Sequence, residues 1–106
     1  CYYLYFSPHD EQGNDLDYDE SMMRIKEVIN QHDIAGYTLY NQIEGGYRGS
    51  DGIMNVNKGY ELILMDISKK DAYDIASELG DAFDNQGVMV EEVIIRHSIV
   101  HSDSLK

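Results

Sequence analysis

Two stripes of apolar residues at helical spacing, set between strand-like segments, constrain the fold of this chain most strongly. The clearer stripe lies within residues 71–85, and its members are Ala72, Ile75, Ala76, Leu79, Ala82 and Phe83. Ser68 followed by Asp71 resembles a capping box with Asp in place of Glu, and Asn85 and Gly87 are suited to end a helix. The pattern predicts an amphipathic helix.

The second stripe begins at about Asp19, where the spacing of apolar residues changes. Met22, Ile25, Val28, Ile29 and His32 share one side at three- and four-residue spacing. The acidic cluster Asp17, Asp19 and Glu20 suits the positive end of a helix dipole. We therefore expect a second amphipathic helix after the polar loop at 8–17.

Four segments have the composition of strands. Residues 2–6 are aromatic and apolar, residues 37–43 alternate, and residues 60–67 are almost continuously apolar, as expected of a central strand. Residues 88–100 form the last predicted strand, bent or broken near Arg96 and His97.

The predicted order is strand, helix, strand, strand, helix, strand. With 106 residues, the chain is expected to form a single α+β domain, 1–106, with the ferredoxin-like β-α-β-β-α-β split fold. The predicted core consists of Leu4, Ile25, Ile29, Leu39, Leu62, Leu64, Ile75, Leu79, Phe83, Val93 and Ile95.

Charge limits the possible partners. The chain has 20 acidic and 8 basic side chains, a net charge of -12, and a surface that repels phosphate backbones and anionic lipids. Direct nucleic-acid binding and membrane insertion are therefore not expected, and no apolar run approaches the roughly 20 residues of a membrane helix. The single cysteine, Cys1, excludes an intramolecular disulfide. We interpret the start at Cys1 as a removed Met or a cloning boundary, with a lipidated cysteine as the alternative, and expect a cytoplasmic protein.

Catalytic and metal-binding patterns are weak. Asp15, Asp17 and Asp19 have the spacing that begins a calcium loop, but the sixth and twelfth positions are Glu20 and Lys26 instead of Gly and Glu. His97 and His101 would share one face of a strand and are weak metal candidates only. No Gly-x-Ser-x-Gly motif is present. We expect no metal site and no enzyme.

The glycine-rich connection at 44–59 is the most informative segment for function. It is much longer than a hairpin loop of about 2–5 residues requires, and it is expected not to be regular throughout. It matches neither a Walker loop nor a dinucleotide fingerprint. Its glycine N–H groups and Arg48 could face an anion.

At these residues the sequence resembles a known family. Residues 34–39 (Ile-Ala-Gly-Tyr-Thr-Leu), 43–45 (Ile-Glu-Gly) and 46–49 (Gly-Tyr-Arg-Gly) resemble the "aGaTVlrGIEGfG" segment of a small PII-like family of unassigned function. The likeness continues through 61–66, 71–85 and 87–93, so it covers most of the chain from Tyr3 to about Arg96. Two pairs depart from it, namely Asn41-Gln42 for Arg-Gly and Gly46-Tyr47 for Phe-Gly.

The resemblance implies a PII-like homotrimer in which three sheets face one another. It also implies that the loop at 44–59 reaches a target protein and that a small effector, with an adenine nucleotide as one candidate cofactor, binds in clefts between subunits. By position, the ligand-binding residues would be Gly36, Thr38, Glu44, Gly45, Arg48, Gly87 and Arg96. With so few cations, a polyphosphate site would need them gathered around Arg48 and Arg96.

The function expected from the sequence is a non-enzymatic regulatory module that senses a small ligand. The alternative is an acidic interaction or inhibitor protein that blocks a basic partner surface, as a nucleic-acid mimic does. Carboxylates clustered on one face would favour the mimic, and an even distribution would favour the regulator.

Overall fold

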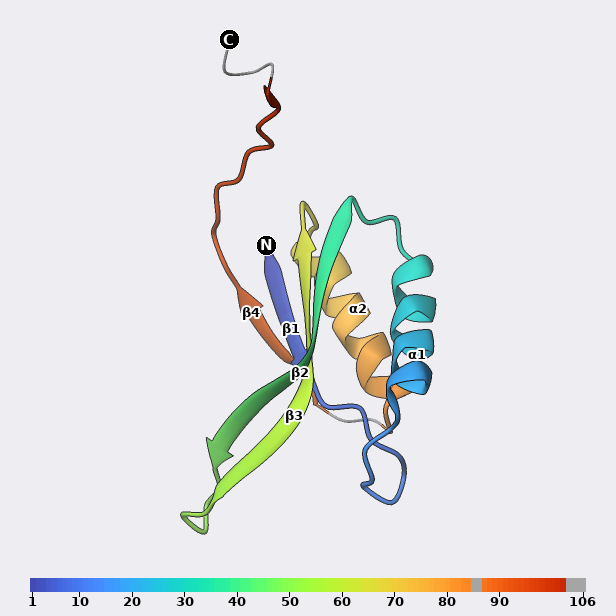
Figure 1. The fold of residues 1–106 in the computed structure, drawn as a ribbon, viewed down its shortest axis with the longest axis vertical. Coiled ribbons are helices and arrows are strands. Elements are labelled where there is room, and N and C mark those ends of the chain that lie inside the picture. Colours follow the sequence, from blue (N-terminus) through green and yellow to red (C-terminus); the bar gives the residue numbers. More distant parts are fainter. Residues whose placement is uncertain (85–86, 103–106) are drawn as a thin grey trace.

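The computed structural model describes residues 1–84 and 87–102, which form a four-stranded antiparallel sheet covered on one face by two helices (Figure 1). The elements are β1 (Tyr2–Phe6), α1 (Tyr18–Asn30), β2 (Gly36–Arg48), β3 (Met54–Met65), α2 (Lys69–Ala82) and β4 (Met89–Glu92). The strand order is β2-β3-β1-β4, so β3 is an inner strand, as its apolar sequence predicted. This α+β architecture is compatible with the predicted ferredoxin-like fold.

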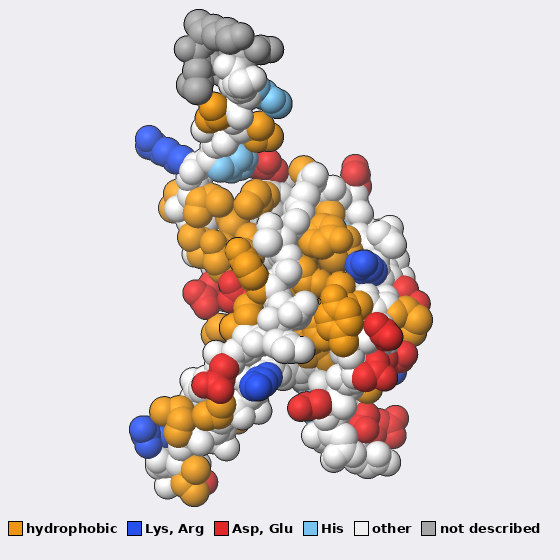
Figure 2. All heavy atoms as spheres, viewed as in Figure 1, with side chains coloured by type: hydrophobic (Ala, Val, Ile, Leu, Met, Phe, Trp, Pro, Cys, Tyr) orange, Lys and Arg blue, Asp and Glu red, His pale blue; other side chains and the backbone are white. Residues whose placement is uncertain are grey.

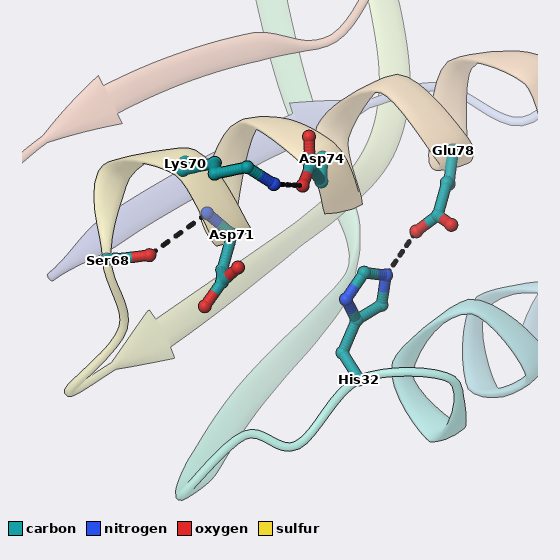
Figure 3. A network of polar contacts seen from close by, with 6 residues as sticks. All are labelled: His32, Ser68, Lys70, Asp71, Asp74 and Glu78. Atoms are coloured by element: carbon teal, nitrogen blue, oxygen red, sulfur yellow. Dashed lines mark hydrogen bonds and ion pairs between the residues drawn. The ribbon is translucent and has the colours of Figure 1, made fainter.

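Both helices begin at side-chain caps. The Asp17 carboxylate accepts the backbone N–H of Glu20 at 2.8 Å, and the Ser68 hydroxyl accepts that of Asp71 at 3.1 Å (Figure 3). The capping box predicted at Ser68 is therefore present in its first half. Asn85, expected at the end of the second helix, lies outside the described residues.

The core lies between the helices and one face of the sheet. Phe6 is its centre, because its ring stacks on Tyr60 and on Phe83 with centroid distances of 6.0 and 5.8 Å. Eight of the predicted core residues are buried: Leu4, Ile25, Ile29, Leu62, Leu64, Ile75, Leu79 and Phe83. Leu39 packs partly buried against them. The prediction for Ile95 is wrong, since this side chain is 38% exposed beyond the end of β4, and Val93 is only half-buried.

Polar contacts fix the two helices to each other. The Arg24 guanidinium binds Glu20 within α1 and donates to the carbonyl oxygen of Ala82 in α2 at 2.7 Å. His32, just after α1, contacts the Glu78 carboxylate on α2 (Figure 3). These contacts span residues distant in sequence, so they orient the helix layer on the sheet.

The connection at 44–59 is more regular than the sequence predicted, because residues 44–48 and 54–59 are strand and only 49–53 form the turn between them. β2 and β3 remain paired as far as Arg48 opposite Met54, and together they form a long hairpin arm that leaves the body of the sheet (Figure 1). The register shifts between Tyr40 and Ile43, and Gln42 at that irregularity has a φ of 55°. Cross-strand hydrogen bonding supplies the order that the glycine content seemed to exclude.

The last strand is shorter than predicted. β4 ends at Glu92 instead of continuing to residue 100, and the Val93 N–H donates to the Cys1 carbonyl oxygen at 2.8 Å. Residues 93–100 then continue beyond the sheet without regular structure (Figure 1). A strand needs a neighbour, and no described strand lies beside this segment.

Candidate ligand-binding cleft

A cleft of about 650 Å³ lies where the hairpin arm leaves the sheet. Figure 2 shows it as a hollow between the hairpin arm at lower left and the first loop at lower right. Its walls come from the end of β1, the first loop, both strands of the hairpin arm and residues 87–89. The cleft therefore lies at the junction between the hairpin arm and the body of the sheet.

Tyr5 lies at the centre of this site. It is directly opposite Glu61 of β3 and Met89 of β4, on the sheet face that the helices leave uncovered. Its hydroxyl lies within hydrogen-bonding distance of the carbonyl oxygens of Ile43, at 3.3 Å, and Asn57, at 3.2 Å. Since one hydroxyl has one proton, the two carbonyl groups share it. Tyr5 thus connects β1 to both strands of the hairpin arm.

Two glycines allow the hairpin to approach β1 this closely. A Cβ atom on Gly45 would lie 2.8 Å from the Tyr5 hydroxyl oxygen. A Cβ on Gly59 would lie 2.4 Å from the Phe6 carbonyl oxygen and 2.8 Å from the Ser7 hydroxyl oxygen. The Gly59 contact involves backbone atoms, so glycine is required there, whereas a Cβ on Gly45 would force the Tyr5 side chain to shift.

The first loop is closed by its own hydrogen bonds. The Asp10 carboxylate accepts the backbone N–H groups of Gln12 and Asn14, each at 2.9 Å, and these bonds, Asn14 foremost, hold the Asp10 pKa below its usual value. A backbone bridge pairs His9 with Asp15. The resulting turn places His9 and Asp15 in the wall of the cleft.

The side chains around the cleft are aromatic and acidic. Asp15, Glu44 and Glu61 contribute carboxylates, Tyr5 and Tyr47 contribute aromatic rings, and none of the described lining residues is Lys or Arg. Such a site favours a neutral or cationic ligand, because carboxylates attract cations and aromatic faces bind both rings and cations. A polyphosphate would be repelled unless it carried its own counter-ion.

Three of the seven ligand-binding residues predicted from the sequence line this cleft. Glu44, Gly45 and Gly87 come together there from the hairpin and the segment before β4. Gly36 and Thr38 lie on the other half of β2, before the register shift, and do not line it.

The two predicted cations lie apart from the cleft and from each other. Arg48 is at the far end of the hairpin arm, where its guanidinium donates to the Gly52 carbonyl oxygen at 2.6 Å. Arg96 is in the segment beyond β4, which leaves the sheet in the opposite direction (Figure 1). One chain alone therefore does not gather the basic residues that a phosphate site needs.

Metal and membrane candidates are limited in the part of the chain that the structure describes. His97 and His101 are exposed in the segment after β4. Across residues 1–84 and 87–102, no three His, Cys, Asp or Glu side chains come together as metal ligands would. The helices found there are too short or too polar to cross a bilayer.

Several residues of the cleft were not predicted from the sequence. Tyr5, Asn57 and Glu61 belong to strands whose pairing was needed to bring them together, and His9 lies in the polar loop that follows the first strand. The alternation of β1 separates Tyr3 and Tyr5 from the buried residues Leu4 and Phe6. This alternation is the one sequence pattern that could have placed Tyr5 on the uncovered face.

The carboxylates are distributed over the molecule. They occur in the first loop, on both helices, in the hairpin and at the end of β4, and part of their charge is paired, as in Lys70 with Asp74 at 2.7 Å (Figure 3). The described carboxylates are therefore not confined to a single element of the fold.

Comparison with known proteins gave no match, either to a family model or to a curated protein. The resemblance to the PII-like family therefore stays a prediction.

Proposed function

We propose that this protein is a non-enzymatic, PII-like binding module that senses a small ligand in the cleft and signals through the hairpin at 44–59. The observation that carries this proposal is the composition of the cleft walls. Glu44, Gly45 and Asn57 belong to the hairpin, whereas Tyr5, His9 and Asp15 belong to the body. A ligand that contacts both sets would change the free energy of the hairpin's position, which is the basis of a sensor.

The residues that line the cleft favour a ligand that has a flat ring together with hydrogen-bond donors or a positive charge. An adenine base meets this description, because its ring can stack on tyrosine and its amino group can donate to a carboxylate such as Glu44. The phosphates of a nucleotide would require Mg²⁺ or a cation from another chain, since Arg48 and Arg96 of this chain are distant.

The uncovered sheet face of this chain is suited to form the trimer that the resemblance implies. The sheet face that the helices leave uncovered has Tyr3, Tyr5, Tyr40, Ile63 and Met65 on successive strands. Tyr40 is 52% exposed in the single chain. Ile63 is already buried in the single chain. Three such faces packed together would cover the other side chains and bring the clefts near subunit boundaries.

The end of the hairpin supports a role in contacting a target protein. Tyr47, Ile53, Met54 and Val56 are all exposed by 46–62% at the end of a paired, extended arm. Aromatic and methionine side chains in such positions are typical of protein–protein contacts.

A thermal-denaturation panel tests the ligand proposal. Adenosine, agmatine, ATP and ATP with Mg²⁺ should be added to the protein; adenosine or agmatine should raise the melting temperature, and ATP without Mg²⁺ should not. Gly45→Ala, whose Cβ would displace Tyr5, and Glu44→Gln should weaken the shift. Gly36→Ala is the matched control, because a Cβ there has no neighbour within 4 Å. If no compound raises the melting temperature, or if Gly45→Ala shows the same shift as the unchanged protein, the proposal is contradicted.

A further inference from the structure

Residues 89–100 have a sequence that is complementary to itself when read in the opposite direction. The sequence is Met-Val-Glu-Glu-Val-Ile-Ile-Arg-His-Ser-Ile-Val. Two carboxylates, Glu91 and Glu92, precede three β-branched residues, and the basic pair Arg96 and His97 follows them. β-branched residues are strand formers, so an acidic, an apolar and a basic block lie in one strand-prone segment.

The structure leaves this segment without a partner on its outer side. β4 is the edge strand of the sheet, and the chain continues past it beyond the Val93 N–H, which donates to the Cys1 carbonyl oxygen. In the described part of that continuation, Ile94 is 95% exposed, Ile99 79% and Val100 64%. An apolar, strand-prone edge of this kind pairs with another strand when one is available.

We propose that residues 89–100 pair antiparallel with the same segment of a second copy of this chain, centred on Ile94. The pairs, each between the two copies, are Glu92 with Arg96, Glu91 with His97, Val93 with Ile95, and Met89 with Ile99. Two-fold symmetry makes each of these pairs occur twice. The two sheets join edge to edge into one continuous sheet.

The chemistry selects this register over its neighbours. Moving the centre to Val93 places Glu92 opposite Ile94, and moving it to Ile95 places Ile94 opposite Arg96. A centre at Glu92 or at Arg96 places two like charges directly opposite each other, which destabilises a strand pair. All five of these registers keep the helices of both copies on the same face, and only the Ile94 centre puts every charge opposite a complementary group.

The Glu92 carboxylate is already held at the edge. It accepts a hydrogen bond from the Tyr2 hydroxyl at 3.3 Å, and burial of the Tyr2 side chain, followed by the nearby Glu92 charge, raises the Tyr2 pKa. A carboxylate has a second oxygen, which is free to accept from the Arg96 guanidinium of the second copy.

This pairing is independent of the proposed function. It uses the strand edge, whereas the proposed trimer uses the sheet face. Edge pairing alone gives a dimer.

Cysteine cross-linking tests the centre of the pairing. In full-length protein with Cys1→Ser, Ile94→Cys should give a covalent dimer with a short bismaleimide, because the two copies of residue 94 are directly opposite. Ile99→Cys is the matched control, since its two copies would lie ten residues apart along the strands, roughly 33 Å. Cross-linking of Ile94→Cys with none for Ile99→Cys is expected. No dimer from Ile94→Cys, or equal dimer from both, overturns the proposal.

A charge exchange tests the register. Arg96→Glu alone creates two Glu–Glu contacts and Glu92→Arg alone creates two Arg–Arg contacts, so each variant should self-associate roughly tenfold more weakly or worse in analytical ultracentrifugation. An equimolar mixture should recover association, because both pairs are again complementary. Arg48→Glu, with the same charge change on the hairpin, should associate like the unchanged protein. Failure of the mixture to recover, or weakening by Arg48→Glu to the same degree, overturns the register.

Discussion

Gly59 is the residue whose substitution should most directly perturb the junction between the hairpin and β1. A Cβ at this position would lie 2.4 Å from the carbonyl oxygen of Phe6 and 3.1 Å from its carbonyl carbon. Backbone atoms cannot move aside by changing a rotamer, so Gly59→Ala forces the two strands apart. Overpacking costs typically 1–3 kcal/mol, and a backbone clash belongs at the upper end, about 3 kcal/mol. For a chain of this size we expect the melting temperature to fall by roughly 12 °C or more.

Urea unfolding followed by circular dichroism measures this loss as a decrease in midpoint at constant slope. Gly36→Ala is the control, because it lies in the same hairpin and a Cβ there meets nothing within 4 Å. Its stability should stay within about 0.5 kcal/mol of the unchanged protein. If Gly59→Ala is as stable as Gly36→Ala, the close approach of β3 to β1, and with it the geometry of the cleft, is refuted.

Three further substitutions test other parts of the fold by the same unfolding assay. Ser21→Ala should stabilise the protein by about 1 kcal/mol, because the buried Ser21 hydroxyl has no hydrogen-bond partner among the described residues; a loss of stability would contradict this. Gln42→Gly should stabilise by up to about 1 kcal/mol, since it relieves a φ of 55° at the register shift; destabilisation would mean that the Gln42 side chain matters more than its backbone. Leu79→Ala should cost about 2–5 kcal/mol because Leu79 is fully buried, whereas Met23→Ala, at a half-exposed helix position, should change stability by less than about 0.5 kcal/mol. Equal losses from Leu79→Ala and Met23→Ala would contradict the assigned core.

Local spacing was sufficient to predict the layers of the fold. The stripe that contains Ile75 and Leu79 is buried as a helix, Ser68 caps it, and the apolar strand with Leu62 and Leu64 is an inner strand of the sheet. These features depend on the period of 3.6 or 2 residues and on neighbours close in sequence, so a single sequence contains them.

The cleft was predictable only in part. Glu44, Gly45 and Gly87 were selected by their positions in the resemblance to the PII-like family, and they do line the cleft. Tyr5 and Glu61 were not selected, because neither belongs to a motif. Their relation exists only through the register that places them opposite each other in β1 and β3.

The sequence by itself determined the two helices, the inner strand, most of the buried residues and how strongly acidic the chain is. Pairing between two strands decided that residues 44–59 form an arm, because it joins residues 6 to 14 positions apart, from Arg48 opposite Met54 to Glu44 opposite Lys58. Tertiary structure also decided that residues 93–100, although rich in strand-forming side chains, do not extend β4. A strand is stable only beside another strand, and whether a neighbour exists is a property of the assembled sheet.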